Sequence, residues 1–172
     1  MKWLKLALSV VIVAASLEAI RYVSYMQVRC NDVAMTVGND MTKMATWSDL
    51  SLITVATREN LARIEPCRQR LPWNIDLQML AAANYAARDQ HDDAIRVFEE
   101  ALRYDHRPEL YFGLGQELLK AGRVDEAIRP LAIAYSIKTN YIMDIDNIDV
   151  RARVMAAVDP RGILRPRPNA SR

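Results

Sequence analysis

Glycine, cysteine and histidine are scarce in this sequence. Its 172 residues include five Gly, two Cys and two His. It has no glycine-rich loop to cradle a phosphate, no nucleophile elbow and no paired-carboxylate site. The cysteines are not spaced as C-x-x-C and no histidine lies near them in the sequence, a pattern that disfavours thiol catalysis. We therefore expect no enzyme activity and no cofactor.

Strand-like alternation of apolar and polar residues is almost absent as well, so the sequence predicts an all-α fold. The net charge of +2 is unevenly distributed. Residues 1–30 and 161–172 each carry four Lys or Arg, whereas the stretch between them has 15 basic and 20 acidic residues. A nucleic-acid-binding domain would carry a basic stripe on its folded body, so we expect no nucleic-acid partner.

Two consecutive stretches of 33 residues resemble each other. Residues 75–107 read IDLQMLAAANYAARDQHDDAIRVFEEALRYDHR, and residues 108–140 read PELYFGLGQELLKAGRVDEAIRPLAIAYSIKTN. The segment DDAIR of the first aligns with DEAIR of the second. A period of this length with two helical halves indicates a repeat architecture, which more often builds a binding surface than an active site.

Small residues recur where two antiparallel helices would touch: Ala82 and Ala94 in the first stretch, Gly115 and Ala127 in the second. A bulky residue and another alanine follow each pair. This pattern resembles the tetratricopeptide repeat family. Gly122, after a helix end and before an acidic new start, fits the turn between paired helices, and Asp89 takes its place in the first repeat. The resemblance implies antiparallel helix-pair repeats over residues 75–140.

Two repeats are fewer than a free-standing solenoid needs, so flanking helices must cap them. We expect a helical cap over residues 29–74, with a degenerate repeat as a candidate from residue 41 onwards. A second capping helix is predicted over residues 141–158, where Asp146 or Asn147 would begin a helix running to about Val158. Residues 159–172, rich in Pro and Arg, predict an extended tail.

An apolar run, LALSVVIVAASL, follows Lys2 and Lys5 within residues 1–28. One interpretation is a cleaved signal peptide. The other is a transmembrane anchor over residues 3–25, with Trp3, Tyr22 and Tyr25 at the membrane interfaces. We favour the anchor, because the helical pattern continues past the run without a turn residue. The N-terminus would then lie in the cytoplasm, with the repeats on the periplasmic side of the inner (plasma) membrane.

Cys30 and Cys67 are a candidate disulfide, since an extracytoplasmic domain permits one. The alternative is that Cys67 is a small core residue at a helix contact. Two acidic clusters have structural explanations. His91 with Asp92 and Asp93 falls at a helix start, and Asp144, Asp146 and Asp149 lack the glycine and glutamate of a calcium loop. We expect no metal site.

In the family that the repeats resemble, the first helix of each pair lines a groove that holds a peptide or a helix. The matching positions here form two faces. The first-repeat face would comprise Asp76, Met79, Leu80 and Ala83, and the second-repeat face Glu109, Phe112, Gln116 and Lys120. The family's carboxylate clamp is missing. An apolar centre with polar flanks favours an amphipathic helix or apolar peptide as partner, unless a helix of this chain, over residues 142–158 or residues 50–64, fills the groove.

The sequence thus predicts a membrane-anchored adaptor, scaffold or assembly factor for a cell-envelope complex. Two alternatives remain open: a cleaved, soluble periplasmic protein with a chaperone-like role, and an accessory subunit of a larger membrane assembly.

Overall fold

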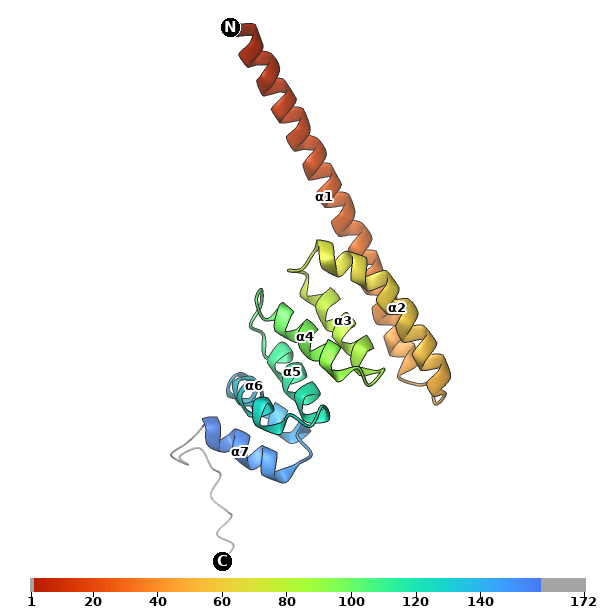
Figure 1. The fold of residues 1–172 in the computed structure, drawn as a ribbon, viewed down its shortest axis with the longest axis vertical. Helices are drawn as coiled ribbons and strands as arrows, with labels where there is room; N and C mark the ends of the chain where they lie inside the picture. Colours follow the sequence, from red (N-terminus) through yellow and green to blue (C-terminus); the bar gives the residue numbers. More distant parts are fainter. Residues whose placement is uncertain (1, 159–172) are drawn as a thin grey trace, which may run out of the picture. The chain divides into compact units, whose positions relative to one another are not determined.

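The computed structural model describes the backbone of residues 2–158 and the side chains of residues 11–158. Across these residues the chain is all-helical, without a strand (Figure 1). It divides into two compact units, Met1–Leu71 and Pro72–Arg172, and each is described here by itself. The basic tail predicted over residues 159–172 lies outside the described part.

The first unit is a hairpin of two helices, α1 (Lys2–Met44) and α2 (Leu50–Arg70) (Figure 1). No proline interrupts α1, so the helix continues through the boundary that the sequence suggested between residues 28 and 29. Asp49 begins α2, and its carboxylate accepts a hydrogen bond of 2.8 Å from the backbone amide of Ser51.

The two helices pack along a seam. In the described part of α1, residues 11–44, the buried residues are Met26, Cys30, Val37 and Met44, at intervals that are sums of three and four. Such spacing places them in one stripe of the helix. Across the hairpin, Asn60 Nδ2 lies 3.8 Å from Met44 Sδ and Arg63 Nη1 lies 3.5 Å from Asp40 Oδ2.

The candidate degenerate repeat from residue 41 onwards does not form a helix pair of its own. The segment contains the end of α1, one turn and the single helix α2. α2 passes through Pro66 without a break, and no residue with positive φ stops it there. It ends at Arg70, because Leu71 precedes Pro72 and leaves the helical conformation, with φ −125° and ψ 63°. The helix that partners α2 is the second half of α1.

The second unit is a series of helices in which each α-helix packs against the next α-helix (Figure 1). Its elements are α3 (Ile75–Ala86), α4 (His91–Ala101), α5 (Pro108–Lys120), α6 (Val124–Ile137), the 3₁₀ helix η1 (Thr139–Asp144) and α7 (Ile148–Val158). The first four correspond to the two 33-residue stretches, with one helix pair in each.

The turns within the two pairs are built alike. Asp89 and Gly122, 33 residues apart, have φ angles of 56° and 76° and end their helices in the left-handed conformation. The Asp89 amide donates to Ala86 O at 3.0 Å, and the Gly122 amide donates to Leu119 O at 3.0 Å. Asp is one of the few residues that adopts this conformation readily, so Asp89 serves where the second repeat has glycine.

Glycines of α5 admit large side chains from both neighbouring helices. A Cβ at Gly115 would lie 2.5 Å from Leu131 Cγ of α6, and a Cβ at Gly113 would overlap the Phe98 ring of α4. The absence of these two β-carbons lets α4 and α6 approach α5 closely. Ala82, Ala94 and Ala127, the other small contact residues of the sequence pattern, have no exposed surface.

The end of the chain departs from the expected single capping helix over residues 141–158. η1 comes first, and α7 then begins after Asn147, whose side-chain Oδ1 accepts hydrogen bonds from the amides of Asp149 and Val150 at 2.9 and 3.1 Å. The side chains of Val150 and Val154 are buried. α7 therefore covers the exposed side of α6, as a cap does.

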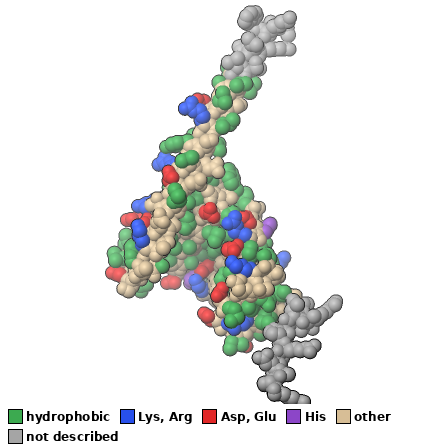
Figure 2. All heavy atoms as spheres, turned by 180° about the vertical axis from the view of Figure 1, so that it is seen from behind, with side chains coloured by type: hydrophobic (Ala, Val, Ile, Leu, Met, Phe, Trp, Pro, Cys, Tyr) green, Lys and Arg blue, Asp and Glu red, His purple; other side chains and the backbone are tan. Residues whose placement is uncertain are grey.

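In the first part of α1, the side chains of residues 11–25 are all exposed, and Figure 2 shows apolar side chains along this helix. Among the described residues, no helix has a stretch that is both long and apolar enough to cross a membrane. The predicted anchor over residues 3–25 begins before residue 11, so its first part lies outside the described side chains.

Cys30 of α1 and Cys67 of α2 are joined by a disulfide, with their Cα atoms 5.5 Å apart. Both are buried in the seam of the hairpin. The bond closes a loop that spans 37 positions of sequence and includes the turn between the helices. It prevents the two helices from separating at this level.

Replacement of Cys67 by Ser should lower the unfolding free energy of the first unit. Closing a loop of this length stabilises a fold by about 4 kcal/mol through the entropy of the unfolded chain. Urea unfolding followed by circular dichroism, with and without a reductant, measures the change. The reductant should destabilise the wild type and leave the Cys30→Ser/Cys67→Ser protein unaffected. Equal stability of the wild type in both conditions would contradict a disulfide that forms in solution.

Candidate functional site

The first-repeat face lies on α3. Asn74 begins this helix, and its Oδ1 accepts a hydrogen bond of 3.2 Å from the amide of Leu77. Asp76 is exposed, whereas Met79, Leu80 and Ala83 are half-buried. Their intervals of three and four residues place them along one side of the helix. The opposite side carries the buried residues that pack in the second unit, among them Leu77, Ala81 and Ala82.

The second-repeat face lies on α5, and the chain itself covers three of its four residues. The ring of Phe112 stacks on the ring of Tyr141 in η1, with centroids 4.3 Å apart and an interplanar angle of 9°. Gln116 Nε2 donates to the backbone carbonyl of Asp144 at 3.0 Å. Sequence reasoning treated this face as open or covered by a helix from residue 142 or residue 50 onwards. The segment on it is η1, which begins three residues before Ile142.

Glu109, the third covered residue, forms a polar cluster with the same segment. Its Oε1 accepts a hydrogen bond of 3.2 Å from the Tyr141 hydroxyl and lies 3.5 Å from Lys138 Nζ. Lys138 Nζ is also 4.8 Å from the centre of the Tyr141 ring. The backbone amide of Glu109, followed by the Tyr141 hydroxyl and the Lys138 ammonium, holds the pKa of the Glu109 carboxyl below its usual value.

Lys120, the last residue of the second-repeat face, pairs within its own helix. Its Nζ lies 2.8 Å from Glu117 Oε1, and His91 Nδ1 of α4 lies 2.8 Å from Glu117 Oε2. Glu117 is only 5% exposed, so the two partners satisfy a buried carboxylate. The contact between His91 and Glu117 joins the two helix pairs. The sequence analysis explained His91 only by its position at the start of a helix, whereas the structure also gives it this contact.

Tyr141 and Lys138 are the residues of this surface that sequence reasoning missed. A signal was present, because the two repeats begin at Ile75 and Pro108 and Tyr141 stands at the next position of the 33-residue period. At this position the structure has the six-residue η1, which begins at Thr139, instead of a long helix.

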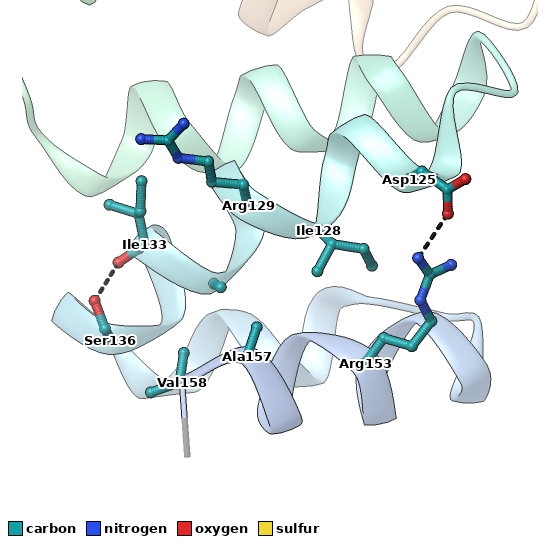
Figure 3. A pocket seen from close by; sticks show the side chains of 9 residues that line it. Asp125, Ile128, Arg129, Ile133, Ser136, Arg153, Ala157 and Val158 are labelled. Atoms are coloured by element: carbon teal, nitrogen blue, oxygen red, sulfur yellow. Dashed lines mark hydrogen bonds and ion pairs between the residues drawn. The ribbon is translucent and has the colours of Figure 1, made fainter. Parts of the chain in front are cut away.

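A hollow lies between α6 and α7 in the second unit (Figure 3). It is open and has a volume of about 560 Å³, with Ile128, Ala132 and Ala157 among its apolar lining residues. At its edge Arg153 Nη2 pairs with Asp125 Oδ1 at 2.6 Å (Figure 3). The one hydroxyl that lines it, on Ser136, donates to the Ile133 carbonyl at 2.7 Å. The hollow offers apolar contact area and no activated nucleophile.

Within the described residues, no cluster of three or more His, Cys, Asp or Glu side chains could hold a metal ion. Both cysteines are in the disulfide. A comparison with known protein families finds no family model that matches the chain, and a comparison with curated proteins finds no significant match.

Replacement of Tyr141 by Ala should uncover Phe112 and lower the unfolding free energy of the second unit by about 1–2 kcal/mol. Loss of the ring removes an aromatic pair and part of its buried area. Tyr104→Ala is the control, because Tyr104 is 52% exposed and its loss should cost less than about 0.5 kcal/mol. Urea unfolding of both variants measures the difference, and equal losses would contradict a stabilising role for η1.

The stabilisation that Glu109 provides through its contact with η1 should decrease at acidic pH. Its pKa is lower in the folded chain than the usual value of 4.5, so the ionised carboxylate stabilises the fold above that pH. This stabilisation is lost as the pH falls through the folded pKa, below 4.5. The wild type should therefore be more stable than Glu109→Gln at pH 6, and this advantage should be smaller at pH 3. Urea unfolding at both values tests this, and an unchanged difference would contradict it.

Proposed function

We propose that this protein is an adaptor or assembly factor that binds another protein through its helix pairs and is held at a membrane by α1. One observation carries the proposal. The two helix pairs use the same turn, with Asp89 and Gly122 in the same left-handed conformation 33 residues apart. Such regular stacking of helix pairs supports a tetratricopeptide-like repeat, an architecture whose common use is the binding of peptides and helices.

The first-repeat face is the part of the groove proposed to bind the partner. Glu109, Phe112 and Gln116 are already in contact with η1, whereas Met79, Leu80 and Ala83 remain half-exposed. An apolar centre beside the exposed carboxylate of Asp76 fits the apolar side of an amphipathic helix that carries a basic residue at its edge. No nucleic acid is part of this proposal.

The exposed part of α1 supports attachment to a membrane. Residues 11–17 are VIVAASL, and all of them are exposed although α1 is apolar around its whole circumference there. A helix of this kind is stable when lipid or other helices cover it. The disulfide of the hairpin supports an oxidising compartment for the rest of the chain. The proposal therefore places the helix pairs on the periplasmic side of the inner membrane of a cell envelope.

Site-specific photo-crosslinking tests the binding surface. A benzophenone amino acid is placed at Met79 on the first-repeat face, or at Arg96, an exposed residue of α4 outside that face. In membranes of the source cell, the label at Met79 should crosslink to one defined protein, and the label at Arg96 should not. Crosslinks of equal yield from both positions, or none from Met79, would contradict the proposed surface.

Two alternatives predict other results when the crosslinking is extended to the soluble fraction and to a label on α1. A soluble, chaperone-like protein released by cleavage would be crosslinked in the soluble fraction, without the residues of α1 before the cleavage site. An accessory subunit of a larger membrane assembly would crosslink through α1, for example from Ile12, as well as from its helix pairs.

A further inference from the structure

We propose that Arg29 and Arg70, referred to below as the arginine pair, bind the phosphate of an anionic lipid headgroup where α1 meets the membrane. The inference rests on the proposed membrane attachment and adds the class of lipid that the protein selects. It follows from the position of the two side chains, their lack of acidic partners, and the aromatic residues beside them.

The arginine pair lies where the hairpin ends and α1 continues alone. Arg70 is the last residue of α2, and its Nη1 lies 3.6 Å from Met26 Sδ on α1. Arg29 is one turn of α1 away from Met26, on the same side of the helix. The two guanidinium groups are therefore carried by different helices, at positions about one helical turn apart along the hairpin.

Neither arginine forms an ion pair with any described residue. Asp32, the acid three positions beyond Arg29, is exposed and does not pair with it. Most other arginines of the first unit do have such partners: Arg21 pairs with Glu18, Arg63 with Asp40 and Arg68 with Glu65. Two exposed, unneutralised guanidinium groups attract an anion, and the planar fork of arginine matches the oxygens of a phosphate.

The surroundings of the pair favour lipid as the source of that phosphate. Tyr22 and Tyr25 are 59% and 61% exposed. Together with the exposed ion pair of Glu18 and Arg21, they lie between the arginine pair and the apolar residues 11–17. Exposed tyrosines between an apolar helix and basic residues are the arrangement found at the interface of a membrane with water. In such a position a phosphate of the headgroup layer would reach both arginines while the apolar run remains among the acyl chains.

The test uses the full chain, purified in a neutral detergent. It is titrated with short-chain phosphatidylglycerol and, separately, with phosphatidylcholine, and binding is followed by native mass spectrometry. The wild type should prefer the anionic lipid by roughly 30-fold, from the attraction of two arginines. Arg29→Gln/Arg70→Gln should reduce this preference to near unity.

The matched control is Arg58→Gln/Arg103→Gln, which removes two exposed arginines elsewhere and so lowers the net charge equally. It should retain the preference. The proposal that the arginine pair binds an anionic lipid would be overturned by equal affinity of the wild type for both lipids. It would also be overturned if the control lost its lipid preference to the same extent. Flotation with neutral phosphatidylcholine vesicles tests the attachment separately. If the wild type does not float, the proposed membrane attachment fails and the arginine pair fails with it.

Discussion

The close approach of α4 and α6 to α5 is the constraint on which the second unit depends. Phe98 and Leu131 each occupy the space that a β-carbon of Gly113 or Gly115 would fill. These contacts set the distance of α5 from its neighbours and its rotation about its own axis. They therefore also determine which side of α5 does not pack against α4 or α6. That side carries Phe112 and Gln116, so the candidate binding surface follows from the packing on the other sides.

The segment after α6 covers part of this surface on α5. Tyr141 stands in register with the first residues of α3 and α5, yet the segment that follows is too short for another helix of that kind. Its ring covers Phe112, and α7 then covers α6. A stack of two helix pairs leaves apolar surface at its end, and these two elements remove it from water. The face on α3 keeps the half-exposed side chains of Met79, Leu80 and Ala83.

Much of the helical organisation could be predicted from the sequence, because it depends on local signals. Gly122 and the acidic residues after it mark a turn, and the small residues at Ala82 and Gly115 mark helix contacts. The all-helical fold was predicted correctly. The hairpin was not: the 33-residue period suggested a pair of helices after residue 41, whereas α2 pairs with α1 along a seam that the sequence analysis did not consider. The 33-residue period points to position 141, but the stacking of Tyr141 on Phe112 depends on the path of the chain after α6, which the local helix and turn signals do not encode.

The central claim is that the first part of α1 lies in lipid while the hairpin lies in water. Nitroxide amino acids at Val13 and Met35, which are both exposed on α1, test it most directly. After reconstitution of the full chain into vesicles, electron paramagnetic resonance compares relaxation by dissolved oxygen and by a water-soluble nickel chelate. The account predicts that oxygen dominates at residue 13 and nickel at residue 35. Strong relaxation by nickel at both residues would contradict it.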